Sequence, residues 1–293
     1  MEVVKSRADM VSIARQLTRA NRIIGFVPTM GALHEGHLSL MREARGQCDA
    51  LVVSIFVNPT QFGPAEDFEK YPRDLERDAA LLTRENVDYL FTPEVGDIYP
   101  PGFSTYVTVE GLSEQLEGAS RRGHFRGVAT VVAILLNIVR PDVAFFGQKD
   151  AQQAAVLKRM VRDLAFDTKV VVLPIVREES GLALSSRNAY LNDEERRAAA
   201  ALQRGLSQAA AAYGKGERNA ARLIGIVRAT IESEPRARID YISVNDTDTF
   251  KPLDEITEKP ALLSLAVFVG KTRLIDNVIL GQAQPKDAAI ARA

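Results

Sequence analysis

Short, almost continuous apolar runs alternate with helix-patterned segments through residues 1–176 of this chain. The run at 49–57 is apolar along nearly its whole length, which is typical of a strand in a parallel sheet covered on both faces. Strands that alternate with helices at this spacing predict an α/β, Rossmann-like doubly wound parallel sheet. The expected strands cover 23–28, 49–57, 87–91, 143–146 and 168–174, and the expected helices cover 6–20, 38–45, 73–86, 129–139 and 152–163.

The pattern changes after about residue 177. An alanine-rich helix is predicted over 193–213, where Asn192 and Asp193 form a cap signal, and a second helix extends to about residue 231. Three further strands are expected at 239–244, 261–268 and 273–280. We therefore expect two domains, 1–176 and a smaller α+β domain over 177–282, followed by a frayed polar tail at 283–293.

Charge and composition exclude several classes of protein. The 293 residues carry 37 basic and 38 acidic side chains, so a net charge of -1 gives no field for nucleic acid or an anionic membrane. The single cysteine excludes an intramolecular disulfide and favours a reducing compartment. No apolar stretch reaches the length of a membrane span, and the first residues lack the pattern of a secretory signal. A cytoplasmic location is the expectation.

Two of the three histidines stand three residues apart, at His34 and His37, between the first predicted strand and its helix. Ligands of open α/β sheets bind where strands end, and free N–H groups at a helix start favour phosphate. Gly31 and Gly36 allow a ligand to approach the backbone closely. Two alternatives remain: surface histidines without a role, and a zinc site, which needs a third ligand that only the distant His124 or Cys48 can supply.

Other polar segments follow predicted strands or the domain junction, and each can also be an ordinary turn. Gly147, Lys149 and Asp150 follow the strand at 143–146, and Gln152 and Gln153 supply neutral donors and acceptors for a ligand near the start of the next helix. The segment 181–188 brings two hydroxyl groups and a guanidinium to the junction, a preferred place for ligand clefts. In the segment 58–63, Gln61 can hold a small polar substrate and Phe62 an apolar part of it. The loop 121–127 contributes three arginines and His124, which suit an anion. Their coincidence at one sheet edge and the hinge favours a single nucleotide site.

Two common nucleotide motifs are missing from the sequence. There is no Gly-x-x-x-x-Gly-Lys-Ser/Thr phosphate loop and no convincing Gly-x-Gly-x-x-Gly fingerprint. Their absence argues against a P-loop kinase and against a nicotinamide dehydrogenase.

The ordered motifs identify a family resemblance. His34-Glu35-Gly36-His37 resembles the His-x-Gly-His signature of the nucleotidylyltransferase superfamily, and 184–188 resembles its Lys-Met-Ser-Lys-Ser counterpart. The whole chain resembles the pantothenate synthetase (pantoate–β-alanine ligase) family most closely. The matching stretches are 27–37, 55–62, 71–73, 123–128, 146–150, 152–153 and 181–188. Small departures are Arg122 in place of the family's usual Pro, Leu184 for Met and Ser180 for Asp.

The resemblance implies ATP-dependent joining of (R)-pantoate and β-alanine to pantothenate, AMP and pyrophosphate through a pantoyl-adenylate. It implies that His34, His37 and Lys149 are catalytic, with His37 as proton donor, and that Gln61 and Gln153 bind pantoate. Gln61 is also expected to bind β-alanine. The ATP site is expected to comprise Met30, Gly31, Ala32, Leu33, His34, Glu35, Gly36, His37, Gly147, Gln148, Lys149, Asp150, Val176, Leu184, Ser185, Ser186 and Arg187.

The resemblance also implies Mg²⁺, held mostly by ATP oxygens, so no protein residue is assigned as a metal ligand. It implies a homodimer formed through the first domain. Two other functions remain open at this stage. An adenylyltransferase can form a dinucleotide from the same histidine motif, although Gln61 and Gln153 suit a small branched acid better than a second nucleotide. A regulatory nucleotide-binding module can retain the fold without turnover.

Overall fold

The computed structural model describes residues 1–64, 66–282 and 290–291 and divides the chain into two compact units. Unit 1 comprises Met1–Gln148 and Gln152–Leu173, and unit 2 comprises Lys149–Ala151 and Pro174–Ala293. The assignment of Lys149–Ala151 to unit 2 is a feature that the sequence pattern does not anticipate. Most of the tail expected to be frayed, residues 283–289 and 292–293, lies outside the described residues.

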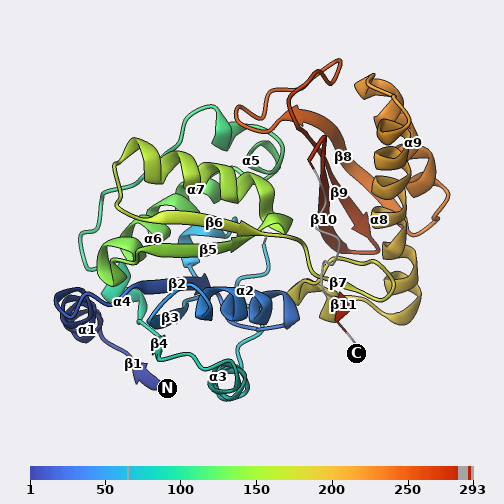
Figure 1. The fold of residues 1–293 in the computed structure, drawn as a ribbon. Helices are drawn as coiled ribbons and strands as arrows, with labels where there is room; N and C mark the ends of the chain where they lie inside the picture. The colour runs from blue at the N-terminus through green and yellow to red at the C-terminus, as the bar shows by residue number, and fades with distance from the viewer. Residues whose placement is uncertain (65, 283–289, 292–293) are drawn as a thin grey trace. The chain divides into compact units, whose positions relative to one another are not determined.

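Unit 1 contains a parallel sheet of six strands in the order β1-β4-β3-β2-β5-β6, which confirms the predicted fold class (Figure 1). All five predicted strands are present. The sixth, β1, is an edge strand of three residues that pairs with β4, and it is too short to produce a periodic pattern. The strands are β1 (Glu2–Val4), β2 (Ile24–Thr29), β3 (Ala50–Ile55), β4 (Tyr89–Phe91), β5 (Val143–Gly147) and β6 (Lys169–Leu173).

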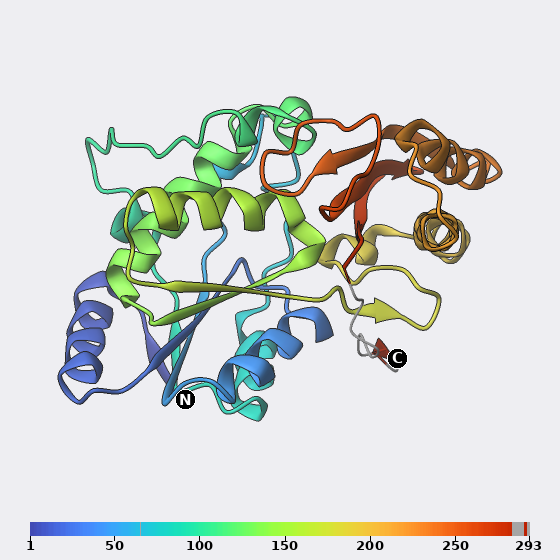
Figure 2. The same ribbon diagram turned by 45° about the horizontal axis from the view of Figure 1, so that its top comes forward.

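Helices cover both faces of this sheet. On one face, α2 and α3 pack Leu38, Met41 and Leu82 onto the buried side chains of Val27 and Val53. Figures 1 and 2 show α6 and α7 on the opposite face of β5 and β6. The helices of unit 1 are α1 (Arg7–Arg19), α2 (Glu35–Arg45), α3 (Leu75–Arg84), α4 (Val95–Ile98), α5 (Glu117–Ser120), α6 (His124–Val139) and α7 (Ala151–Asp163), with 3₁₀ turns η1 (Pro59–Gln61), η2 (Leu112–Glu114) and η3 (Gln148–Asp150).

Helix α6 begins earlier than its sequence pattern predicts. The predicted helix starts at 129 and places His124 in a loop, whereas His124–Gly127 forms the first turn of α6 after Gly123, whose φ is +84°. The stretch His-Phe-Arg-Gly carries a glycine and no apolar period, and both features lower the helical signal. From Val128 onward the helix is apolar on nearly all sides and almost entirely buried.

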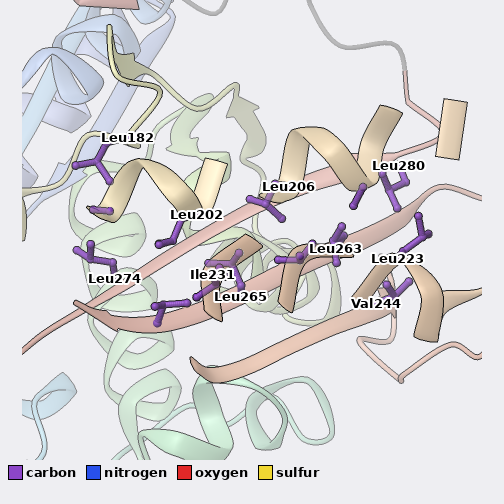
Figure 3. Packing of buried hydrophobic residues seen from close by; sticks show 14 of the residues in the cluster. Leu182, Leu202, Leu206, Leu223, Ile231, Val244, Leu263, Leu265, Leu274 and Leu280 are labelled. Carbon is purple, nitrogen blue, oxygen red and sulfur yellow. The ribbon is translucent and has the colours of Figure 1, made fainter. Parts of the chain in front are cut away.

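Unit 2 contains an antiparallel sheet, in the order β10-β9-β8, that packs against two helices. Figure 3 shows Leu202 and Leu206 of α8, and Leu223 and Ile231 of α9, among side chains of the sheet such as Leu263. The predicted cap of α8 is confirmed, because the Asn192 side chain accepts a hydrogen bond from the N–H of Glu195. The elements are β7 (Arg177–Glu178), η4 (Ser186–Tyr190), α8 (Asp193–Gly214), α9 (Ala220–Glu232), β8 (Ala237–Asp246), β9 (Ala261–Val269), β10 (Thr272–Leu280) and β11 (Ile290–Ala291).

Within the described part of the chain, no helix has both the length and the apolar character needed to cross a bilayer.

Candidate active site

The chain reverses its direction across the sheet between β2 and β5. Strands β3 and β4 follow β2 on one side, and β5 and β6 lie on the other. The register pairs Gly25 with Val143 and Phe26 with Ala144, so these two strands are direct neighbours. Ligands of doubly wound sheets bind at the carboxyl ends of the strands at such a switch point. The histidine segment follows β2, and β5 ends at Gly147 and is followed by Gln148. The switch point therefore carries the histidine segment and the first two residues of the second predicted phosphate segment.

The segment between β2 and α2 makes a left-handed turn. Gly31 has φ +80° and Ala32 has φ +50°, a region that non-glycine residues adopt only at a cost. The Gly31 N–H donates to the Thr29 hydroxyl group, and the Leu33 N–H donates to the Asp78 carboxylate at 2.9 Å. A side-chain carbon on Gly31 would lie 3.0 Å from that carboxylate. The turn therefore requires a glycine and is held by hydrogen bonds at both ends.

Asp78 is a residue that the sequence analysis missed. It lies on α3, its side chain is 1% exposed, and burial raises its pKa, although the N–H groups of Leu33 and Ala32 and the charge of Arg77 act in the opposite direction. The signal was an acidic residue on the apolar face of a helix, one turn before the buried Leu82. A buried carboxylate needs hydrogen-bond donors, and here the donors belong to the candidate site.

The two histidines form a reciprocal cap at the start of α2. The Nδ1 atom of His34 accepts from the Gly36 N–H at 3.1 Å, and the Nδ1 atom of His37 accepts from the His34 N–H at 3.3 Å. In neutral rings this arrangement places the ring proton on Nε2 of both residues. The ring centroids are 4.1 Å apart. The helix start thus presents two neighbouring Nε2–H donors along with the positive end of the helix dipole.

Glu35 belongs to the outer surface of α2. Its carboxylate pairs with Arg42, which also pairs with Glu85 at 2.6 Å. Both partners raise the pKa of the Arg42 guanidinium. The main chain of Glu35 begins the helix, so its place in the predicted ATP segment rests on its backbone.

The segment after β3 is held beside the histidine segment. Asn58 is 1% exposed and donates to the Gln61 Oε1 atom at 3.0 Å and to the Gly127 carbonyl at 3.2 Å. The Gln61 Nε2 atom lies 2.9 Å from the Met30 sulfur. Gln61 and Met30, predicted to bind different ligands, are therefore in contact.

The predicted role of Phe62 is not supported by its contacts. Its ring packs against Phe68 and Tyr71, at centroid distances of 5.3 and 5.9 Å. The aromatic group belongs to a cluster within its own loop.

The two glutamines at the start of α7 differ in their surroundings. Gln152 is 5% exposed, receives a hydrogen bond from the Glu117 N–H and donates to the carbonyls of Leu112 and Gln115. Its amide is therefore committed to holding the segment around α5, and the general expectation that it serves a ligand is wrong. Gln153 is half-buried on the same helix.

The loop 121–127 does not form the expected cluster of arginines around an anion. Arg121 pairs with Glu66 at 2.7 Å, and Arg126 stacks on the Tyr106 ring at 3.6 Å. His124 is 9% exposed, and its two ring nitrogens contact the Gln61 carbonyl and Arg121. Two of the three arginines and the histidine thus serve contacts within the protein.

In unit 2, main-chain and side-chain contacts order the predicted phosphate segment. The Leu184 N–H donates to the Val176 carbonyl at 3.0 Å, and the Ser185 hydroxyl group accepts from the Arg187 N–H at the start of η4. Asn188 is 4% exposed and donates to the Ala183 carbonyl. The segment 184–187 is therefore a defined turn.

A buried ion pair supports the same part of unit 2. Arg177 makes two hydrogen bonds to Asp276, of 2.6 and 3.0 Å, and the Asp276 side chain is 2% exposed. The next residue, Asn277, donates to the Lys149 carbonyl at 3.0 Å. Asn277 thus holds Lys149 through its main-chain carbonyl. Lys149 lies in the turn η3, which directly follows β5.

The predicted site residues therefore fall into two sets. Unit 1 brings together the segment from Met30 to His37 with Gln61, and places Gly147 and Gln148 at the end of the neighbouring strand. Gln153 also belongs to unit 1. Unit 2 contains Lys149, Asp150, Val176, Leu184, Ser185, Ser186 and Arg187.

Comparison with known proteins gives one consistent family. The family described as pantoate-beta-alanine ligase matches residues 2–279. A pantothenate synthetase of Pelotomaculum thermopropionicum is 56% identical over 96% of this chain and 100% of its own length. The crystal structure of pantothenate synthetase from Thermus thermophilus has a TM-score of 0.90 at 46% identity, covering 95% of this chain and 99% of that one.

A second solved structure carries ligands. The pantoate-beta-alanine ligase of Francisella tularensis, complexed with beta-gamma ATP and beta-alanine, has a TM-score of 0.78 at 36% identity. The match covers 95% of this chain and 97% of the Francisella tularensis chain.

Proposed function

The chain belongs to the pantoate–β-alanine ligase family, and we propose that it carries out the family's reaction with the residues described above. The reaction condenses (R)-pantoate with β-alanine and ATP to pantothenate, AMP and pyrophosphate. A pantoate carboxylate oxygen attacks the α-phosphorus of ATP, and the bond to pyrophosphate breaks. The β-alanine amine then attacks the carbonyl of the pantoyl-adenylate and AMP leaves.

The observation that carries the assignment of roles is the reciprocal cap formed by His34 and His37. It holds two Nε2–H donors side by side at a helix start, at the switch point of the sheet. Negative charge develops on the α-phosphate and on the leaving pyrophosphate, and positioned donors stabilise such charge. We assign both histidines to the phosphates, with His37 as the proton donor.

The remaining roles follow the same chemistry. The Lys149 ammonium group, the hydroxyl groups of Ser185 and Ser186 and the Arg187 guanidinium suit phosphate oxygens. Val176 and Leu184 supply apolar surface for the adenine. Gln61 and Gln153 offer amide groups for pantoate, and Gln61 also for β-alanine. The chain from Met30 to His37 and from Gly147 to Asp150 lines the nucleotide.

Among the described residues, no group of three or more His, Cys, Asp and Glu side chains is arranged to hold a metal ion. Mg²⁺ typically keeps several waters and uses substrate phosphates as ligands. We propose that Mg²⁺ enters with ATP, where it would neutralise part of the phosphate charge. We also propose a cytoplasmic homodimer in which residues 1–176 form the ATP- and pantoate-binding domain and 177–282 form a smaller lid domain.

The test measures AMP release with purified protein. AMP is expected only when pantoate, β-alanine and ATP are all present. Pantoate alone is expected to support exchange of labelled pyrophosphate into ATP, because the adenylate forms before β-alanine reacts. AMP release that other carboxylates support equally well, or exchange that needs no pantoate, would refute the assignment.

A further inference from the structure

The third histidine, His124, contacts the main chain of Gln61, a residue of the proposed pantoate site. His124 lies in the first turn of α6 and is 9% exposed, and its Nδ1 atom is 2.8 Å from the main-chain carbonyl oxygen of Gln61. The two residues are 63 positions apart in the chain. None of the roles proposed above for the reaction uses this histidine.

The surroundings of His124 determine where its ring proton lies. A carbonyl oxygen only accepts hydrogen bonds, so Nδ1 must carry the proton and donate. The NH1 group of Arg121, 3.1 Å from Nε2, only donates, so Nε2 must be the acceptor. The ring is therefore oriented with its Nδ1–H donor directed at the Gln61 carbonyl.

Arg121 is itself fixed on its far side. Two of its guanidinium nitrogens donate to the two carboxylate oxygens of Glu66, at 2.8 and 2.7 Å. Such a fork restricts the guanidinium to one orientation. A continuous chain of contacts therefore runs from Glu66 through Arg121 and His124 to the backbone of Gln61.

The side chain of Gln61 is held independently of its backbone. Asn58 donates to the Gln61 Oε1 atom, so the Nε2 group faces Met30. Helix α6 approaches this segment so closely that a side-chain carbon on Gly127 would lie 2.4 Å from the Thr60 carbonyl oxygen. The Gln61 amide can keep one orientation only if the backbone beneath it does not move, and the contact from His124 restrains that backbone.

We propose that His124 is a positioning residue that fixes the backbone of Gln61 and so sets the affinity for pantoate. The proposal rests on the assignment of Gln61 to the pantoate site. His124 acts through Gln61, with no contact to substrate of its own. Its effect should therefore appear in the KM for pantoate and leave the handling of ATP unchanged.

Three substitutions separate the two ring nitrogens. His124→Phe removes both, His124→Asn keeps a donor near the Nδ1 position, and His124→Gln keeps a group near the Nε2 position. We expect the Phe and Gln variants to raise the KM for pantoate about 10-fold, the scale of one lost hydrogen bond. The Asn variant should stay within about 3-fold of the original protein. The kcat and the KM for ATP should change little in all three.

A matched control lies on the same helix. Thr130 is 2% exposed on α6, and its hydroxyl group accepts from the Val107 N–H and donates to the Arg126 carbonyl. Thr130→Val should lower the free energy of unfolding without raising the KM for pantoate. An equal rise in the KM for Thr130→Val and His124→Phe would show that loosening α6 is sufficient, and would overturn the inference.

Gln61→Ala, alone and combined with His124→Phe, distinguishes this inference from the proposed function. If Gln61→Ala leaves the KM for pantoate unchanged, the assignment of Gln61 itself fails. If Gln61→Ala raises it and His124→Phe does not, only the positioning role is overturned. If His124 acts through Gln61, the effects should not add: His124→Phe should raise the KM much less in the Gln61→Ala background. Additive effects would contradict the proposal.

Discussion

The carboxylate of Asp78 lies 2.9 Å from the main-chain nitrogen of Leu33 and joins helix α3 to the turn that precedes His34. The two residues are 45 positions apart in the chain. Because the turn contains two successive residues with positive φ, Gly31 and Ala32, an outside acceptor is needed to keep its N–H groups paired. The position of the histidine pair therefore depends on a helix that carries no residue of the proposed reaction.

We expect Asp78→Ala to lower the free energy of unfolding by about 1–3 kcal/mol, because buried N–H groups lose their acceptor. Its rate of AMP release should fall as well. Asp78→Asn keeps an acceptor oxygen and should retain most of both properties. Urea unfolding and the AMP assay check this pair, and equal losses in the two variants would contradict the role given to the acceptor.

The pH dependence of the Asp78 variants has a defined sign. Burial raises the pKa of Asp78, so the ionised carboxylate is less favourable in the folded state than in the unfolded state. The stability of the original protein relative to Asp78→Asn should therefore fall as the pH rises from the ordinary aspartate value through the raised one. Urea unfolding across this pH range measures the difference.

For His37 we expect the rate of adenylate formation to fall about 10²-fold or more in His37→Ala, the usual scale for a positioned acid or charge-stabilising group. His37→Asn retains an oxygen that can accept from the His34 N–H, so its stability should stay close to that of the original protein. Its rate should nevertheless fall as far as in the Ala variant. A rate restored by Asn would assign His37 to capping alone.

For Lys149 the side chain and the main chain can be tested separately. The described contact to Asn277 uses only the Lys149 carbonyl, so Lys149→Ala should fold normally. The rate of pantoate-dependent pyrophosphate exchange should drop about 10²-fold or more, because a positive group for the phosphates is lost. Lys149→Arg is the matched variant that keeps the charge, and loss of folding in Lys149→Ala would contradict the separation.

The ion pair between Glu66 and Arg121 predicts a component of acid sensitivity. Burial acts to raise the pKa of Glu66, but the hydrogen bond and charge of Arg121 lower it below the ordinary value. The stabilisation is therefore complete above the ordinary glutamate pKa and is lost as the pH falls through the lowered one. The difference in stability between the original protein and Glu66→Gln should shrink on acidification, and a constant difference would refute this.

Two helical glycines should respond to alanine in opposite ways. A side-chain carbon on Gly127 of α6 would lie 2.4 Å from the Thr60 carbonyl oxygen, whereas Gly225 of α9 has no neighbour within 4 Å. Gly127→Ala should lower the free energy of unfolding by about 1–3 kcal/mol and raise the KM for pantoate, because the segment after β3 must shift. Gly225→Ala should raise the free energy of unfolding by about 0.5–1 kcal/mol. Thermal unfolding of the two variants gives the comparison.

The sequence by itself determined the architecture and the motifs. Strands such as 49–57 and 143–146 are short, strongly apolar and separated by helical patterns, so their type and parallel arrangement follow from local chemistry. The segments that carry His34, His37, Gln61 and Gly147 follow these strands directly, so their gathering at one sheet edge could also be predicted. Boundaries were less certain, as the early start of α6 illustrates.

Only the tertiary structure decided which side chains hold those motifs in place. Asp78, His124 and Gln152 each form hydrogen bonds with backbone groups between 35 and 63 positions away. The local hydrophobic pattern of a sequence does not indicate such long-range pairs. Gln152 and Gln153 are adjacent and chemically identical, yet they lie on different faces of α7. Gln152 is buried against α5, and Gln153 is half-buried. Hydrogen bonds between distant segments depend on how the helices dock, so residue type alone could not separate a ligand-binding group from a structural one.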